Sequence, residues 1–374
     1  MNKRTIGIVL VIVIIIAIIA IFGKHSPSQS GPIKIGYVGS LTGDLQPWGE
    51  EQRNAVALAV KEINAQGGIN GRLVDMIYED GACNAAKSTS AAHKLINIDG
   101  VKIIVAWCSQ EALSIAPIAG QNKVIELVSG ATAQELTNIN DYVFRISPSD
   151  KIASKVVADA ITGSYSKIAV LTENSAYSIS LRDDFLSNVN DNNKIIFNES
   201  FDTGTRDFRT LIAKIKAANP DAIFVNANTT LPAALIVKQL RDSQVKVSLY
   251  GAYFGSDPEF IKIAGGATEG FTWVEFIADT AQSSVQKFLA DYKKEYGQDV
   301  QHPQFTALSY DAPYVLKDAI ASAGSDPEKL KTYFKNLNEV HSVLGDFRII
   351  NGDIDGTIFK LRTIKNGQIV DLSN

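Results

Sequence analysis

The chain has 374 residues, of which 45% are hydrophobic and 20% are charged. This length and composition are typical of a folded globular protein with enough apolar residues for about two domains of ordinary size. The formal net charge is −4, and the 36 lysines and arginines form no basic cluster. The charge pattern therefore argues against a nucleic-acid partner.

The first 31 residues differ in kind from the rest of the chain. Lys3 and Arg4 precede an almost purely apolar run at residues 6–22, and a polar stretch follows up to Gly31. A positive end followed by an apolar run is typical of an export signal. As a helix the run is roughly 25 Å long, between a long signal peptide and a short membrane span. Residues 1–31 are therefore predicted to be a signal peptide or an uncleaved signal anchor, and the lack of an A-x-A site favours the anchor.

No second apolar run of spanning length follows Gly31. We therefore expect the rest of the chain to lie outside the membrane, in the periplasm or at the cell surface. An uncleaved N-terminal segment would tether the protein there, and cleavage would release it. A buried core helix is a poor alternative for this segment, because it would be apolar on every side.

Cys83 and Cys108 are the only two cysteines. In the oxidising conditions expected for an exported chain, an even number of cysteines favours a disulfide over two buried thiols. The bridge would close a loop of about 25 residues. Neither cysteine has the spacing of a metal site and the four histidines are dispersed, so the sequence predicts no bound metal.

Strand and helix patterns alternate from Ile33 onward. Short β-branched runs predict strands at residues 34–39, 73–78, 102–106, 124–128, 167–171, 194–197, 222–226 and 247–251. Helical spacing of apolar residues predicts helices at residues 50–65, 85–96, 152–161, 180–189, 208–217 and 231–242. Repeated strand-helix-strand units imply parallel sheets that are covered by helices on both faces.

Two extended segments, residues 142–148 and 270–276, interrupt this alternation because no covering helix follows them directly in the pattern. We interpret them as hinge crossovers between two lobes, with a third crossing near residues 342–347. The sequence thus predicts an α/β fold of two doubly wound parallel-sheet lobes joined by three hinge crossovers. Lobe 1 would comprise residues 32–146 and 277–341, and lobe 2 would comprise residues 147–276 and 342–374.

Catalytic motifs are missing from the sequence. We find no G-x-S-x-G elbow, no G-x-x-x-x-G-K-[ST] phosphate loop, no H-E-x-x-H and no G-x-G-x-x-G after a strand. Neighbouring acids such as Asp183 and Asp184 fit solvated helix faces better than a general acid–base pair. The sequence therefore predicts no catalytic residue and no cofactor, and it argues against an enzyme.

Six motifs of the chain occur together, and in this order, in one known family. They stand at residues 34–43 (KIGYVGSLTG), 62–71 (EINAQGGING), 207–216 (DFRTLIAKIK), 219–221 (NPD), 257–262 (DPEFIK) and 310–312 (YDA). On these motifs the chain resembles the type I periplasmic binding proteins of the leucine/isoleucine/valine-binding family, from Ile33 to Lys360. The resemblance implies a small-molecule ligand, an ABC permease in the membrane as partner, a monomer, and a disulfide between the positions that match Cys83 and Cys108.

The resemblance also implies a ligand site between the lobes, outside the carboxyl ends of parallel strands. Ser109 follows a predicted strand and begins a helical pattern, where free amides and the helix dipole attract anions. The matching family residue holds the ligand carboxylate, and a simple N-cap is the alternative role. Trp48, in the loop after the first strand, matches an aromatic residue that packs on the ligand side chain, although a place in the core fits it as well.

Gly130, Ala131 and Thr132 follow the next predicted strand. Gly130 permits close approach to the backbone, and the matching family residue offers its carbonyl to the ligand ammonium. Thr132 could give its hydroxyl and amide to the ligand carboxylate. An ordinary turn and helix cap is the alternative for this segment.

The second lobe is expected to supply the opposite wall of the site. Tyr177 matches a tyrosine that closes over the ligand, although Ser178 stands where the family often has glycine. Asn228 and Thr229, with the adjacent Thr230, follow a predicted strand and are expected to face the ligand. Loop solvation is the alternative role of these polar side chains.

Tyr253 departs from the family pattern, because branched-chain amino acid binders have an acid there that neutralises the ligand ammonium. A buried ammonium without a counter-charge costs several kcal/mol. Either Asp257 or Glu275 supplies the charge, or the ligand lacks the amine and is an amide, a carboxylic acid or an aromatic compound. We expect a solute-binding protein that closes on a small amino-acid-like, amide or carboxylate ligand and delivers it to an ABC importer. A ligand-sensing extracellular module with a separate signalling partner is the alternative.

Overall fold

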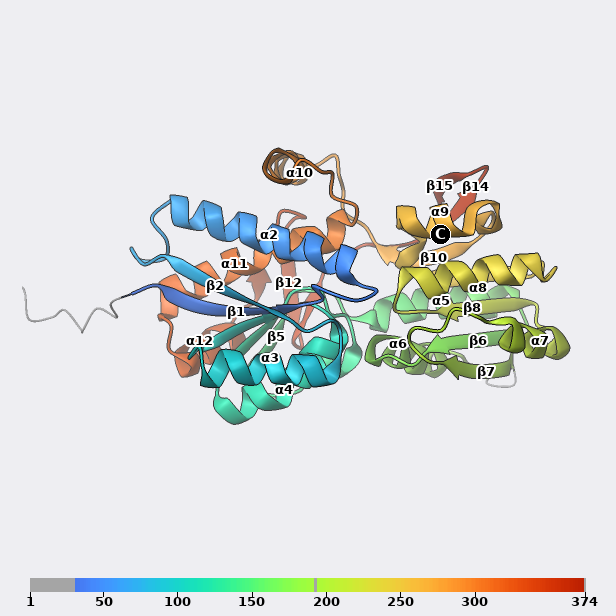
Figure 1. The fold of residues 1–374 in the computed structure, drawn as a ribbon, viewed down its shortest axis with the longest axis horizontal. Coiled ribbons are helices and arrows are strands. Elements are labelled where there is room, and N and C mark those ends of the chain that lie inside the picture. The colour runs from blue at the N-terminus through green and yellow to red at the C-terminus, as the bar shows by residue number, and fades with distance from the viewer. Residues whose placement is uncertain (1–30, 192–193, 373–374) are drawn as a thin grey trace, which may run out of the picture. The chain divides into compact units, whose positions relative to one another are not determined.

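The structure, a computed structural model, describes residues 31–191 and 194–372. The chain from Ile33 onward forms one compact unit (Figure 1). Residues 1–30, which hold nearly all of the predicted export signal, lie outside the described residues. Within the described ranges, no helix combines the length and the apolar character that are needed to cross a bilayer.

The first sheet is parallel throughout. Its strands are β1 (Ile33–Gly39), β2 (Val74–Asp80), β3 (Ile103–Ala106), β4 (Ile125–Val128) and β5 (Val143–Arg145), in the order β2-β1-β3-β4-β5. The helices that accompany it are α2 (Gln46–Ala65), α3 (Ala85–Asn97), α4 (Ser109–Asn122), α10 (Ser283–Tyr296), α11 (Pro303–Ala323) and α12 (Pro327–Lys335). Side chains alternate between the two faces of a strand. Val105 accordingly packs with α2, α11 and α12, whereas Ile104 packs with α3 and α4, so both faces of the sheet are buried.

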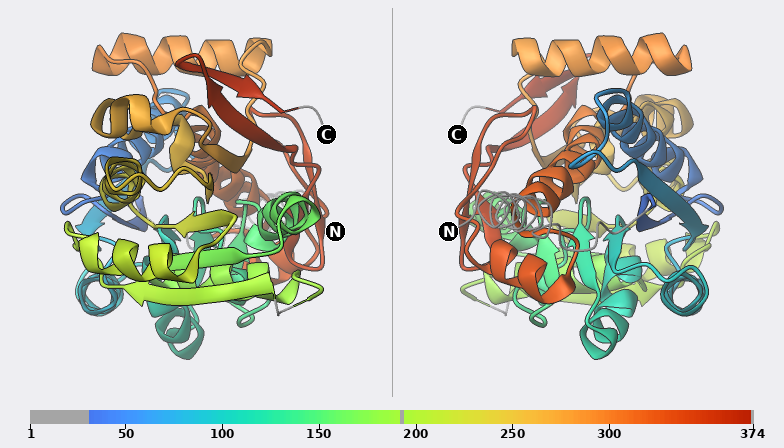
Figure 2. Two further views of the ribbon diagram at one scale, coloured as in Figure 1. Left: turned by 90° about the vertical axis from the view of Figure 1, so that its right-hand side faces the viewer. Right: turned by 90° about the vertical axis from the view of Figure 1, so that its left-hand side faces the viewer.

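The second sheet is mixed. Its strands are β6 (Ile168–Glu173), β7 (Ile195–Phe201), β8 (Ala222–Asn226), β9 (Ser248–Ala252), β10 (Thr272–Phe276), β14 (Phe359–Lys365) and β15 (Gln368–Asp371), in the order β15-β14-β10-β9-β8-β6-β7. Its helices are α5 (Asp150–Ser164), α6 (Ala176–Ser187), α7 (Arg209–Ala218), α8 (Thr230–Asp242) and α9 (Pro258–Ala264). The strands from β6 to β10 are parallel, and the antiparallel pair β14 and β15, red in Figure 2, forms one edge. Val225 packs with α7 to α9 and Phe224 with α5 and α6, so this sheet is also covered on both faces.

A small antiparallel sheet was not expected from the sequence. It contains β11 (Glu339–Val340), β12 (Phe347–Ile350) and β13 (Asp353–Asp355). Three short 3₁₀ helices complete the described elements, η1 (Gln134–Leu136), η3 (Phe254–Ser256) and η4 (Gly265–Thr268). The third predicted crossing, near residues 342–347, lies between β11 and β12 of this sheet.

The predicted α/β fold class with two lobes of mostly parallel sheet is confirmed, whereas the two extended segments differ from their interpretation. Each segment contains a strand, because its apolar residues pair with a buried neighbour: β5 with β4, and β10 with β9. A helix also follows the first segment closely, since α5 begins at Asp150. The chain therefore crosses between the sheets after these strands, at residues 146–149 and 277–282. The lobe boundaries at residues 146, 276 and 341 stay a prediction.

Candidate functional site

A cavity of about 80 Å³ lies where loops from both sheets meet. The loops follow β1, β3 and β4 of the first sheet and β6, β8 and β9 of the second, so the cavity is built at the carboxyl ends of parallel strands. The residues that line it are Leu45, Trp48, Trp107, Cys108, Ser109, Gly130, Ala131, Thr132, Tyr177, Ala227, Asn228, Thr230, Ala252, Tyr253, Phe254 and Phe305. All the residues predicted to contact a ligand lie in this lining except Thr229.

The start of α4 points its positive end at the cavity. Ser109 is the first residue of this 14-residue helix, and Cys108 is its N-cap in extended conformation. The first amides of a helix have no intrahelical acceptor, and the helix dipole is positive there. The Ser109 hydroxyl is buried and accepts a weak hydrogen bond from the Ala133 amide at 3.4 Å. This end of the cavity can therefore bind an anionic group.

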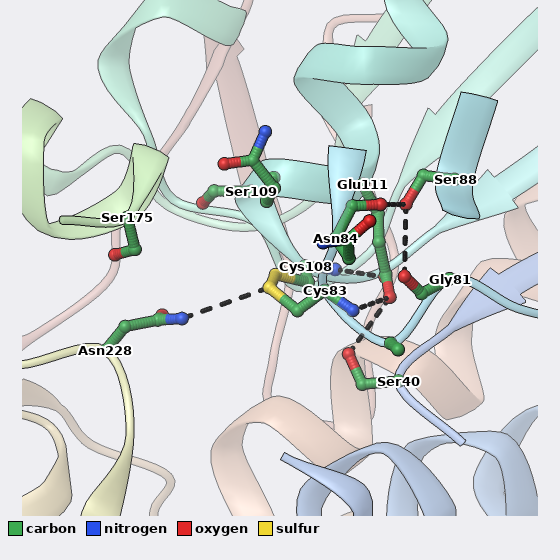
Figure 3. Close-up of a disulfide and its surroundings, with 12 residues drawn as sticks. Ser40, Gly81, Cys83, Asn84, Ser88, Cys108, Ser109, Glu111, Ser175 and Asn228 are labelled. Atoms are coloured by element: carbon green, nitrogen blue, oxygen red, sulfur yellow. Dashed lines mark hydrogen bonds between the residues drawn. A yellow bond between two sulfur atoms is a disulfide. The ribbon is translucent and has the colours of Figure 1, made fainter. Parts of the chain in front are cut away.

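Glu111 and a disulfide fix the start of α4 in place (Figure 3). Cys83 and Cys108 are joined by the disulfide, with their Cα atoms 5.8 Å apart. The Glu111 carboxylate accepts hydrogen bonds from the Ser40 hydroxyl at 2.9 Å and from the amides of Cys83 and Cys108 at 3.0 Å each. Complete burial outweighs these bonds and raises the pKa of Glu111 to about 7. The carboxyl group thus ties three loops of the first sheet together beneath the anion-binding end.

The turn at Gly130 has a packing role that the sequence did not reveal. A Cβ atom at Gly130 would lie 2.3 Å from the Trp107 ring, so any larger residue would displace this tryptophan from the cavity wall. The hydroxyl of the nearby Thr132 donates a hydrogen bond to Asp150 at 2.7 Å. That proton is therefore directed at a protein carboxylate rather than at the cavity.

Asp150 is a buried acid behind the cavity wall. It begins α5 and accepts hydrogen bonds from Thr132 and, at 2.8 Å, from the Tyr253 hydroxyl. Burial raises the pKa of Asp150 to about 7, although these two bonds and the charge of Arg145 oppose the rise. The sequence reasoning missed Asp150, and its only signal was the Ser149-Asp150 pair that caps a helical pattern.

The loop after β8 takes its conformation from Glu173. The buried Glu173 carboxylate accepts hydrogen bonds from the Asn228 amide at 2.8 Å and the Thr229 amide at 3.3 Å. The Thr229 hydroxyl also lies next to this carboxylate, at 3.4 Å, so its side chain faces away from the cavity. Thr230 lines the cavity in its place. The Asn228 side chain reaches towards the first sheet, with its amide nitrogen 3.9 Å from the Cys83 sulfur (Figure 3).

Aromatic rings form much of the remaining wall. Trp48 lies in the first turn of α2 rather than in the expected loop, because the helix begins at Gln46 with proline in its first turn. The ring centroid of Tyr253 is 6.3 Å from that of Tyr177 and 5.5 Å from that of Phe305. Trp107, Phe254 and Phe305 were not predicted, because their types and spacing do not distinguish them from core residues.

None of the described residues that line the cavity is charged. The two acids proposed to replace the missing counter-charge both lie outside the lining. Asp257 accepts hydrogen bonds from Trp48 Nε1 at 3.0 Å and the Thr230 hydroxyl at 2.6 Å. Glu275 forms an ion pair with Arg362 at 2.8 Å. A ligand ammonium in this cavity would therefore have no carboxylate in direct contact.

Comparison with known proteins places the chain in one family. The sequence model of a family described as periplasmic binding protein matches residues 32–360. A Leu/Ile/Val-binding protein of Rhizobium johnstonii is 28% identical over 353 residues, which cover 92% of this chain and 95% of the relative. A leucine-, isoleucine-, valine-, threonine- and alanine-binding protein of Pseudomonas aeruginosa is 29% identical over 321 residues, which cover 84% of this chain and 85% of the relative.

Solved structures share the same fold. The crystal structure of a leucine-binding protein from Thermotoga maritima matches with a TM-score of 0.81 at 26% identity, over 91% of this chain and 98% of that chain. A solute-binding protein of an ABC transporter from R. palustris, in complex with benzoate, matches with a TM-score of 0.78 at 21% identity, over 91% of this chain and 96% of that chain.

Proposed function

The chain belongs to the type I periplasmic binding proteins of the branched-chain amino acid family, and we propose that it captures a small carboxylate whose body is apolar or aromatic and carries no ammonium group. Family members are substrate-binding proteins and not enzymes.

The observation that carries the proposal is an uncharged cavity with a helix start at one end. The first turn of α4 places the Ser109 hydroxyl and the positive end of the helix dipole at the cavity, where they can bind a carboxylate. A carboxylate binds there without a basic side chain because the helix dipole and several N–H groups share the stabilisation. An ammonium would need a carboxylate in contact, and leaving it unpaired would cost several kcal/mol.

The body of the ligand would lie among aromatic rings. Trp48, Trp107, Tyr177, Tyr253, Phe254 and Phe305 all line the cavity. Such rings gain about 0.5–1.5 kcal/mol per well-oriented aromatic contact beyond the burial of apolar area. The relatives named for branched-chain amino acids and the benzoate complex have the same fold, so the fold accommodates both kinds of body.

Both lobes contribute to the wall, which supports binding by closure. The loops around Ser109 and Thr132 belong to the first sheet, and those around Tyr177 and Asn228 to the second. A ligand that contacts both lobes favours the closed state by the difference in contacts between the two states. We propose that an ABC permease recognises this closed form, and that residues 1–31 hold the monomeric protein at the outer face of the membrane when they are not cleaved.

Matched ligand pairs test the class of ligand by titration calorimetry. L-Leucine is compared with 4-methylpentanoate, and L-phenylalanine with 3-phenylpropanoate, because each pair differs only in the ammonium group. We expect the compound without the ammonium to bind more tightly in each pair, by about 10-fold or more. Benzamide against benzoate tests the carboxylate in the same way. Tighter binding of the amino acids would refute the proposed ligand class and point to amino acid transport.

A further inference from the structure

His302 lies directly behind the cavity wall, where it stacks on Trp48. The two ring centroids are 3.5 Å apart and the ring planes are inclined by 25°. His302 is 6% exposed and precedes the first residue of α11, so it belongs to the first sheet's side of the molecule. His302 does not line the ligand cavity, but Trp48, on which it stacks, does.

Two carboxylates flank the His302 ring from different elements. Glu51 of α2 lies 3.6 Å from Nδ1, and Asp257, the N-cap of α9, lies 3.6 Å from Nε2. The Glu51 carboxylate also accepts hydrogen bonds from the amides of Gln301 at 2.8 Å and His302 at 3.0 Å, so its position is fixed within its own lobe. Burial lowers the pKa of His302, but the two carboxylates outweigh it and raise the pKa to about 9. The ring is therefore cationic at neutral pH.

Asp257 makes this arrangement a contact between the lobes. Its carboxylate accepts a hydrogen bond from Trp48 Nε1 at 3.0 Å and lies 3.6 Å from His302 Nε2. Trp48 and His302 both lie beside the first sheet. On its own side Asp257 accepts hydrogen bonds from the Thr230 hydroxyl at 2.6 Å and the Glu259 amide at 2.8 Å. The Asp257 carboxylate of the second lobe thus contacts His302 and the indole N–H of Trp48 from the first lobe, beside the cavity.

We infer that His302 and Asp257 are positioning residues, whose ion pair forms when the lobes close, holds Trp48 against the ligand and takes up a proton at His302. The inference rests on the proposed closure around a ligand. In an open form Asp257 moves away with its lobe, and His302 retains only Glu51 as a neighbouring acid. Burial lowers the pKa of His302 in the closed form, so hydration on opening opposes a fall. Losing one of its two carboxylate neighbours lowers the pKa by about 1–3 units, and we expect this effect to dominate.

The other charged groups near His302 do not replace Asp257. His302 also borders an outer hollow of about 600 Å³, whose charged lining residues are Glu275, Asp279, Lys360, Arg362 and Asp371. Arg362 pairs with Glu275 at 2.8 Å and with Asp371 at 3.0 Å, and Lys360 pairs with Asp371 at 2.6 Å. The carboxylates within 4 Å of the His302 ring in the described residues are Glu51 and Asp257. His302 therefore favours closure fully below its open-form pKa, and this contribution is lost as the pH rises from that pKa to the closed-form value of about 9.

A form that is held closed without a ligand tests the His302–Asp257 ion pair, which we call the latch, independently of ligand binding. Asp44 and Arg206 face each other across the lobes at 2.8 Å, so D44C and R206C can be joined by a short thiol-reactive crosslinker in the full chain in detergent. Histidine-selective NMR then follows the titration of His302 with and without the crosslink. We expect the crosslink to raise the pKa of His302 by about 1–3 units. We expect D257N to abolish this rise, and D257E to restore it. His93, which is exposed on α3 away from the crossings, serves as the reference. An equal His302 pKa in the locked and free forms would overturn the inference.

A ligand experiment provides the second readout. Calorimetry with 3-phenylpropanoate at pH 8, in two buffers of different ionisation enthalpy, measures proton uptake on binding. Wild type and H93Q should take up protons, whereas H302Q and D257N should take up fewer and bind the probe about 10-fold more weakly. Proton uptake in H302Q equal to that of wild type would contradict the latch. If none of the matched compounds binds, the proposed ligand class fails, and the crosslinked protein still decides on the latch.

Discussion

The hydroxyl of Tyr253 donates a hydrogen bond to Asp150 across 2.8 Å, behind the wall of the cavity. Tyr253 has backbone angles of φ 55° and ψ −50°, in a region that residues with a side chain rarely adopt. The hydrogen bond to Asp150 and the packing of its ring on Phe305 hold the residue in this conformation. A buried acid is therefore present near the cavity, but Tyr253 lines the cavity in its place.

Replacing Tyr253 by phenylalanine should destabilise the protein in a pH-dependent way. The variant removes one donor from Asp150, whose pKa burial raises to about 7. At pH 8 the carboxylate is charged, and losing a hydrogen bond to a buried charge costs about 1.5–3 kcal/mol in the free energy of unfolding. At pH 5.5 Asp150 is protonated, and we expect a cost of about 0.5–1.5 kcal/mol. Urea unfolding at both pH values measures the difference.

Tyr165 offers the matched control for this variant. Its hydroxyl donates to the Ser248 hydroxyl at 2.7 Å, with no carboxylate involved in the bond. Tyr165→Phe should therefore cost the same at pH 8 and at pH 5.5. A pH-independent cost for Tyr253→Phe would show that Asp150 does not ionise in this range.

Replacing Ser109 by alanine should weaken the binding of a carboxylate. The hydroxyl lies at the start of α4, where the ligand carboxylate is proposed to bind. We expect the affinity for 4-methylpentanoate to fall by about 1–3 kcal/mol, which is the range for a charged partner that loses a hydrogen bond. Ser114→Ala in the same helix is the control, because its hydroxyl donates to the Gln110 carbonyl at 2.6 Å. Calorimetric affinities that are equal for the two variants would contradict this site.

The periodicity of apolar residues predicted much of the fold. Site residues were predictable only where a local sequence pattern, such as a helix start after a strand, marks them. β-Branched runs predicted the buried parallel strands, since both faces of such strands are apolar. Ser109 and Tyr177 lie in the first turns of helices after strands, a position that local patterns predict. Phe305 and Asp150 reach the site through long-range packing, which leaves no signature in their own neighbourhood. Thr230 rather than Thr229 lines the cavity because Glu173 binds the Thr229 amide and so sets the direction of that side chain. The sequence gives no signal for this direction.

Reducing the disulfide should both destabilise the protein and weaken binding. Cys83 and Cys108 are separated by 25 residues, and a loop of that size contributes roughly 3 kcal/mol on the loop-entropy model. Cys108 also caps α4, and the Asn228 side chain contacts the Cys83 sulfur from the second lobe. We therefore expect the double variant Cys83→Ala/Cys108→Ala to unfold at lower urea and to bind carboxylates more weakly. Unchanged unfolding in the variant and in wild type treated with reductant would refute a stabilising disulfide.

Replacing Glu126 by glutamine should stabilise the protein at alkaline pH. Glu126 lies in the middle of β4, is fully buried, and neither of its carboxyl oxygens has a hydrogen-bond partner among the described residues. Burial raises its pKa well above the ordinary value. Because the folded state binds this proton more tightly than the unfolded state, the contribution to stability is complete below the unfolded pKa and is lost as the pH rises, by about 1.4 kcal/mol per pH unit until the folded pKa is reached.

The glutamine variant avoids this loss, so it should exceed wild type in the free energy of unfolding by about 2 kcal/mol or more at pH 8 and match it closely at pH 4.5. Glu50→Gln on the exposed side of α2 should stay within about 0.5 kcal/mol of wild type at both pH values. A Glu126→Gln protein that is no more stable than wild type at pH 8 in urea unfolding would mean that the carboxylate has solvent or a partner in the folded state.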